Sequence, residues 1–161
     1  MTLLEITQMA GFFAAHAIWC VSDGETLIPI VAHPDGAGKR VMERVVSDDS
    51  RAAVAITKEK LPSIAKENGG AVLLYDSFVT LGFWRTDAIM IEIVSQDARL
   101  IMAVPYRHLK DHAGFAVFKP KFVECSDSGA DYQALSEAFF RGVDSHEKGS
   151  AVWSKYIDQS K

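Results

Sequence analysis

Residues 71–107 read AVLLYDSFVTLGFWRTDAIMIEIVSQDARLIMAVPYR and carry the strongest structural signal in the chain. The stretch is rich in β-branched and aromatic residues, which favour strands, and the tight turn Gln96-Asp97-Ala98 interrupts it. Four strands are predicted here and just beyond it: Ala71–Phe83, Ala88–Gln96, Arg99–Arg107 and Phe115–Val123. Because strands joined by short connections pair antiparallel, the middle of the chain is predicted to form an antiparallel β-meander.

Helical patterns flank this β region. Thr2 and Glu5 have the spacing of a capping box, and apolar residues then recur every three or four positions as far as Cys20. This pattern predicts an N-terminal helix that ends before Asp23-Gly24. The further predicted elements are a strand at Leu27–Ala32, a helical stretch at Gly38–Asn68, a helix after Ser128 and a last short helix carrying Val152–Ile157.

The order of these elements gives the expected fold class. We expect an α+β fold, with an antiparallel β-meander sheet of about five strands and the N-terminal and C-terminal helices packed mainly on one face. A chain of 161 residues that is 48% hydrophobic can bury a sizeable core in one domain. We therefore expect residues 1–161 to form a single domain.

Composition narrows the possible functions. The formal net charge of −4 argues against general nucleic-acid binding, which needs a basic surface. Cys20 and Cys125 lie far apart without zinc or redox spacing, so we expect free, buried thiols. Because no dinucleotide fingerprint, phosphate loop or nucleophile elbow occurs, we expect no cofactor.

The apolar run Met9–Val21 raises the question of a membrane segment. It is shorter than the 20 or so residues that span a bilayer, and it contains His16. No Lys or Arg precedes Lys39, whereas a signal peptide has a basic start. We therefore expect a cytoplasmic protein without a membrane segment.

Charged residues within the predicted strands are the first candidate site. Strand alternation places Glu92 among apolar neighbours, and a buried carboxylate is costly unless it is paired. Asp76 and Glu92 should therefore each have a partner, and Arg85, Arg99 and Arg107 are the candidate donors. We expect Asp76, Arg85, Asp87, Glu92 and Arg107 to converge on neighbouring strands.

A catalytic interpretation of these carboxylates is a metal-assisted phosphoester hydrolase. Asp76, Asp87 and Glu92 would hold a divalent cation, and His108 would act as the base. The third element reads Glu92-Ile93-Val94, without the lysine of a Glu-x-Lys motif. An ion-pair network that serves structure alone is the competing interpretation.

Two further features concern surfaces. His108 and His112 are four residues apart, but they precede Gly114 between two β segments, so we expect a solvated loop and no metal site. Gly82-Phe83-Trp84-Arg85 lies where two strands turn, and an exposed aromatic residue beside arginine is typical of protein contacts. Trp84 and Arg85, with Arg107, are therefore candidate binding residues, unless the rings fold back on the core.

The segment Leu74–Thr80, followed by Gly82 and by Arg85–Ile89, resembles a pattern of small bacterial proteins of unknown function. The resemblance covers about 16 of the 161 residues. It implies a bacterial domain and assigns no catalytic role.

The absence of any complete catalytic constellation favours a non-catalytic protein-interaction domain, expected to be a homodimer, with a further protein partner left open. The alternatives are the metal-assisted hydrolase above and a protein that binds a small apolar ligand between sheet and helices.

Overall fold

The computed structural model describes residues 1–161 and consists of four helices and eight strands. In chain order the elements are α1 (Leu3–Val21), β1 (Ile30–Pro34), β2 (Arg40–Arg44), α2 (Ser50–Asn68), β3 (Ala71–Leu81), β4 (Trp84–Val94), β5 (Arg99–Arg107), β6 (Ala116–Phe118), β7 (Lys121–Cys125), α3 (Tyr132–Asp144), α4 (Glu147–Tyr156) and β8 (Ile157–Asp158). This content confirms the predicted α+β class.

All eight strands belong to one curled sheet, in the order β2-β1-β3-β4-β5-β6-β8, with β7 paired to β5 beside β6. Every pairing is antiparallel except that of β6 with β8, which is parallel. The predicted antiparallel sheet of about five strands is therefore wrong, because the sheet is larger and mixed. The last strand has only two residues, too few to leave a pattern in the sequence.

The segment predicted to be helical from Gly38 starts with a strand instead. β2 pairs with β1 in a hairpin whose turn is closed by Asp35, since its carboxylate accepts from the backbone amides of Ala37 and Lys39. The helix begins only at Ser50, after the capping side chain of Asp49. Similarly, the single strand predicted at Phe115–Val123 is divided into β6 and β7.

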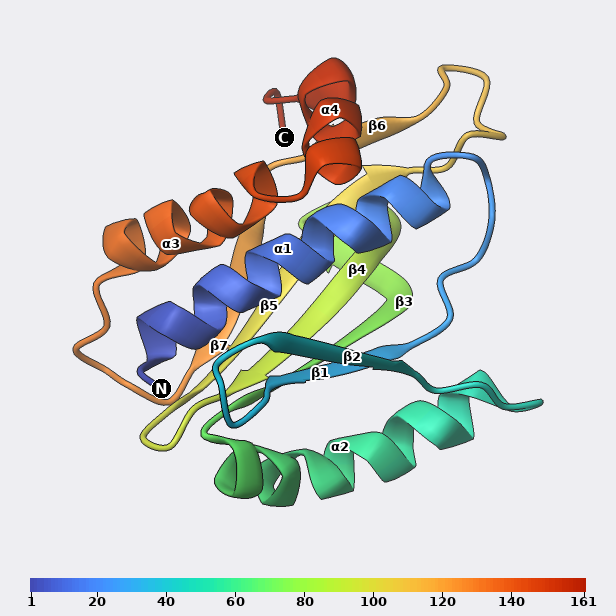
Figure 1. Cartoon of the computed structure of the whole chain (residues 1–161). Coiled ribbons are helices and arrows are strands. Elements are labelled where there is room, and N and C mark those ends of the chain that lie inside the picture. The colour runs from blue at the N-terminus through green and yellow to red at the C-terminus, as the bar shows by residue number, and fades with distance from the viewer.

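The two faces of the sheet are covered by different helices (Figure 1). On one face Val72, Leu74, Ile89 and Ile91 pack in a core of 27 buried residues together with α1, α3 and α4. On the other face Leu73 joins a smaller cluster with residues of α2. The terminal helices thus share one face, and the two faces carry side chains of alternate residues, as strand geometry requires.

Helices α1 and α3 cross in close contact because each has a glycine at the crossing. A side-chain carbon on Gly142 would lie 1.8 Å from the carbonyl oxygen of Gln8, and one on Gly11 would lie 1.8 Å from that of Phe139. No larger residue fits either position, so this pair of glycines fixes the position of α3 over α1.

Helix α1 is long and apolar enough to cross a membrane by length and composition. In this fold 61% of its most apolar 18-residue stretch is buried, which is also typical of the core helix of a soluble protein. The capping box predicted for Thr2 and Glu5 is present at its start.

Candidate functional site

Four of the residues singled out in the sequence line one open hollow of about 450 Å³ at the end of the β3–β4 hairpin. Arg85 and Asp87 come from β4, Arg107 ends β5, and His108 begins the following loop. Phe78, Thr86 and Asp111 complete the wall. We call this hollow, together with the hairpin turn at Gly82-Phe83, the hairpin-tip surface.

The hairpin turn presents an aromatic ring to solvent. Leu81 pairs with Trp84, so Gly82 and Phe83 form a two-residue turn, and the φ of +64° at Gly82 suits the first central position of a type II′ turn. Phe83 is fully exposed there. Below it on β3, Phe78 is 61% exposed, and the guanidinium of Arg85 lies 4.9 Å from the centre of its ring.

Trp84, by contrast, turns back onto the protein. Its ring packs edge-on against Phe118 at 4.8 Å, and the ammonium of Lys161 lies 4.7 Å from its centre. The sequence left open whether the two rings of the turn are exposed or fold back, and the structure divides them. Phe83, not Trp84, is the aromatic residue free for contacts.

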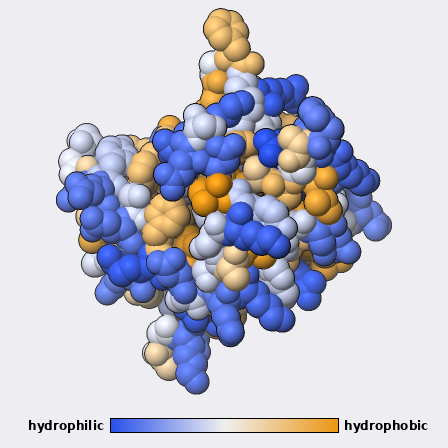
Figure 2. Space-filling view, turned by 90° about the horizontal axis from the view of Figure 1, so that it is seen from above, coloured by the Kyte–Doolittle hydropathy of each residue, from blue (hydrophilic) through white to orange (hydrophobic).

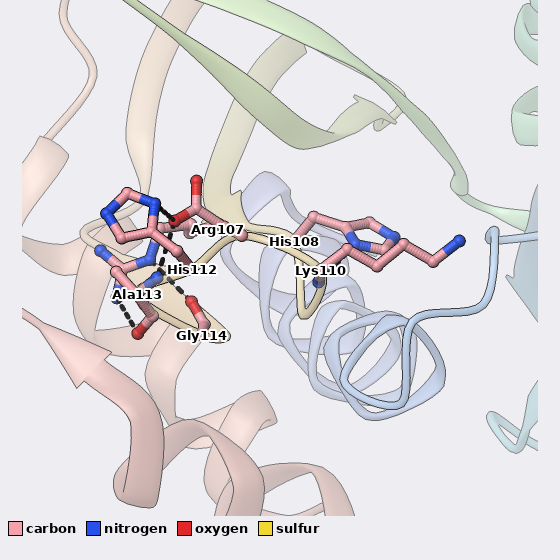
Figure 3. A network of polar contacts seen from close by, with 7 residues as sticks. Arg107, His108, Lys110, His112, Ala113 and Gly114 are labelled. Carbon is pink, nitrogen blue, oxygen red and sulfur yellow. Dashed lines mark hydrogen bonds and ion pairs between the residues drawn. The ribbon is translucent and has the colours of Figure 1, made fainter.

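On the side away from β3 and β4, the hollow is bounded by the loop after β5, which Arg107 holds through hydrogen bonds (Figure 3). Its guanidinium donates from Nε to the carbonyl of Gly114 at 2.7 Å and from an Nη atom to that of Ala113 at 3.2 Å. Within the loop, Nδ1 of His108 accepts from the backbone amide of Lys110 at 3.0 Å. Figure 3 shows His108 and His112 pointing to opposite sides, so the two imidazoles do not form a joint ligand pair.

Asp87 of the hollow shares one face of the sheet with a second carboxylate, that of Asp76 on β3. The Tyr106 hydroxyl donates to both oxygens of Asp76, each at 2.8 Å. Burial raises the pKa of Asp76, and the nearby charge of Asp87 raises it further, while the Tyr106 hydrogen bond opposes the change. Burial also raises the pKa of Asp87, against the effect of His108.

Glu92 lies on the opposite face, beneath α2. Its side chain is almost fully buried and accepts from Arg99 at 2.7 Å and from the Tyr75 hydroxyl at 3.2 Å, and the ammonium of Lys58 lies 3.2 Å away. The expected partner Arg99 is therefore present, while Asp76 is paired with a tyrosine instead of an arginine. The structure brings Asp76 and Asp87 together and separates Glu92 from both, which removes the geometric basis of a three-carboxylate metal centre.

The hollow of the hairpin-tip surface is lined by charged groups, a hydroxyl and an aromatic ring. The hydroxyl of Thr86 donates to the backbone oxygen of Tyr106 at 2.8 Å and is thus engaged. The other lining groups are two guanidiniums, two carboxylates, an imidazole and a phenyl ring. Of these, Arg107, His108 and Asp111 are also hydrogen-bonded within the loop. No group of three or more His, Cys, Asp or Glu side chains in the chain is arranged to hold a metal ion.

Two residues of this region escaped the sequence analysis. Tyr106 lies directly opposite Asp87 in the β4–β5 pairing, and Phe78 lies opposite Asp87 in the β3–β4 pairing. Placing Tyr106 on the face of Asp87 requires the β4–β5 register, which the sequence does not show. Both cysteines are free and half-buried, less buried than expected.

Comparison with protein-family models, with curated proteins and with solved structures found no match to this chain. The fold and the site define the class on their own: an α+β protein with a largely antiparallel sheet and a mixed-charge, aromatic surface at one end of its longest hairpin.

Proposed function

We propose that this protein is a non-catalytic protein-interaction domain of the cytoplasm, and that it forms a homodimer through the hairpin-tip surface. The observation that carries the proposal is the fully exposed ring of Phe83 at the turn of a hairpin whose two strands have 11 residues each. Aromatic residues and arginine are enriched at protein interfaces, and here Arg85 lies over the exposed ring of Phe78 on the hairpin that carries Phe83 at its turn.

The charges of the surface favour a second copy of the chain as the partner. A two-fold interface brings the same patch of both subunits together, so the patch must complement itself. Arg85 and Arg107 lie beside Asp87 and Asp111 around one hollow. A two-fold axis close to the turn would allow the arginines of one copy to meet the carboxylates of the other.

The exposed edge strand β2 is the competing dimer surface. All five of its residues are exposed, and its outer edge has no partner strand. Arg40, Glu43 and Arg44 lie on it, and charged side chains on an edge are a usual protection against strand pairing. The hairpin-tip surface, with its exposed rings, is therefore the better-supported interface.

Sedimentation velocity over a concentration series tests this proposal. A dimer held by one hairpin tip and the hollow beside it should be weak, so we expect a dissociation constant of roughly 10 μM to 1 mM. Phe83→Ser should remain monomeric, whereas Ile56→Ser, which removes an exposed apolar residue on α2, should dimerise like the unmodified protein. Equal dimerisation of all three proteins would refute the proposed interface.

A further inference from the structure

A second hollow lies where α3 and α4 pass over the edge formed by β5 and β7. Its volume is about 440 Å³. Its walls come from both helices, from β5, from β7 and the bend before it, and from Ile157 and Gln159 near the C-terminus. Clefts of this size between helices and a sheet are common sites for small ligands. It is separate from the hairpin-tip surface, since the two hollows share no lining residue.

Aromatic rings form the apolar wall of this cleft. Phe139, Phe140 and Trp153 pack edge to face, with ring centres 5.6 to 6.1 Å apart, and Phe122 of β7 faces the same space. Edge-to-face packing favours defined ring positions, so the three rings form one continuous apolar wall. Figure 2 views the molecule from above relative to Figure 1 and shows hydrophobic residues between hydrophilic ones on that side.

One polar group of the wall lacks a partner. The indole N–H of Trp153 is buried and has no hydrogen-bond acceptor in the protein, although buried indole groups normally have one. A ligand oxygen would supply the missing acceptor. Because the nitrogen itself is covered, a neighbouring side chain must move before that oxygen reaches it.

The charges at the rim indicate which head group fits. Lys119 is exposed at the bend between β6 and β7 and forms none of the ion pairs of the chain. Asp144 lies on the rim as well, at the end of α3, and is also unpaired. A ligand carboxylate is attracted to Lys119 and repelled by Asp144, so its head should lie at the lysine side of the cleft.

We propose that this cleft binds a small amphipathic carboxylate, with an alkyl or aryl body against Phe122, Phe139 and Phe140 and its oxygens shared between Lys119 and the Trp153 N–H. The volume suits a body of roughly ten to twenty non-hydrogen atoms. The inference is independent of the proposed dimer, since no residue of the hairpin-tip surface takes part.

Isothermal titration with decanoate, kept below its micelle concentration, tests the proposal, with decylamine as the probe of opposite charge. We expect saturable binding of decanoate and at least tenfold weaker binding of decylamine. Trp153→Phe keeps an aromatic ring but removes the N–H, and Lys119→Gln removes the cation. Each should weaken decanoate binding about tenfold, which is the loss expected for one charged or buried hydrogen bond.

The matched control is Lys121→Gln, which removes a nearby lysine of β7 that does not line the cleft. It should bind decanoate like the unmodified protein. Trp153→Phe changes a buried residue and could disturb the fold. Lys119 is exposed, so Lys119→Gln should fold normally, and its comparison with Lys121→Gln tests the proposal by itself. Absence of saturable binding, equal affinity for decanoate and decylamine, or equal losses in the two lysine variants would overturn the proposal.

Discussion

The hydroxyl of Tyr106 donates to both carboxylate oxygens of Asp76, each at 2.8 Å, and so links β5 to β3 across the intervening strand β4. Tyr106 is among the largest fully buried side chains of the core, and it lies opposite Asp87 of the hairpin-tip surface in the β4–β5 pairing. The bond therefore adds a side-chain link between two strands that do not pair with each other directly.

The variant Tyr106→Phe should lose about 1 to 2 kcal/mol of stability at pH 7, because a half-buried carboxylate loses its charge-assisted donor. The pKa of Asp76 should rise further, and the deficit should shrink as the pH falls through that pKa, since a protonated Asp76 needs no donor. Urea unfolding at several pH values measures this. Tyr132→Phe is the control, because that hydroxyl makes no hydrogen bond, and an equal loss there would contradict the account.

The ion pair between Arg99 and Glu92, beneath α2, should contribute to the free energy of unfolding. The carboxylate of Glu92 is buried and contacts Arg99, Lys58 and the Tyr75 hydroxyl. Arg99→Met removes the shortest of these contacts, and because two partners remain we expect a loss of about 1 to 3 kcal/mol in unfolding free energy. Arg51→Met, at an exposed position of α2 outside every ion pair, should cost less than about 0.5 kcal/mol. Similar costs for the two variants would show that the Glu92 pair contributes nothing.

A histidine pair joins α1 to the start of α4. Nδ1 of His146 accepts from the amide of Gly149 at 2.8 Å, so the proton of neutral His146 is on Nε2, which lies 3.2 Å from Nδ1 of His16. Protonation of either ring breaks this arrangement. Burial lowers the pKa of both histidines below 6.5, with further lowering by His146 and Arg44 at His16, and by Arg40 at His146.

Because the folded protein binds fewer protons at these histidines than the unfolded chain, their contribution to stability is present above pH 6.5 and is lost as the pH falls through the lowered pKa values. Urea unfolding between pH 7.5 and 5 should therefore show a falling free energy. His146→Asn keeps a capping oxygen for Gly149 and should flatten this dependence, whereas His112→Asn, at an almost fully exposed position, should not. An unchanged slope in His146→Asn would contradict the assignment.

The crossing of α1 and α3 depends on glycine. Gly142→Ala would place a methyl group against the carbonyl of Gln8, so the helices must separate. We expect a loss of about 2 kcal/mol or more in thermal or urea unfolding, as for other overpacked cores. Gly36→Ala is the matched control, since nothing lies within 4 Å of the added carbon. A stable Gly142→Ala variant would contradict the close crossing.

The sequence predicted the central part of the fold because β3, β4 and β5 are long and strongly patterned. It failed at β2, where Val41 and Val45 fit a helical spacing equally well, and at β8, which is stabilised only by its pairing with β6. Local pattern cannot reveal pairing between segments that lie far apart in the chain.

The sequence predicted only part of the candidate site, because it does not show how the strands pair. Arg85, Asp87 and Arg107 were chosen as charged residues within the predicted strands and His108 as the candidate base, and the structure brings all four to one hollow. Glu92 was included because the charged residues of neighbouring strands were expected to converge. In the β3–β4 pairing Glu92 lies opposite Leu73, whereas Asp76 lies opposite Ile89, so Glu92 and Asp76 point to different faces of the sheet. Alternation along β4 already separates Glu92 from Asp87, whereas the placement of Asp76 on the face of Asp87 follows from the register.

Hydrogen–deuterium exchange at protein concentrations well below and well above the dissociation constant tests the central claim most directly, because it locates the dimer contact. If the hairpin-tip surface is the interface, amides of residues 78–86 and 108–114 will exchange more slowly at high concentration, and those of β2 will be unchanged. Slower exchange confined to β2 (Arg40–Arg44), or no change anywhere, would contradict the proposed interface.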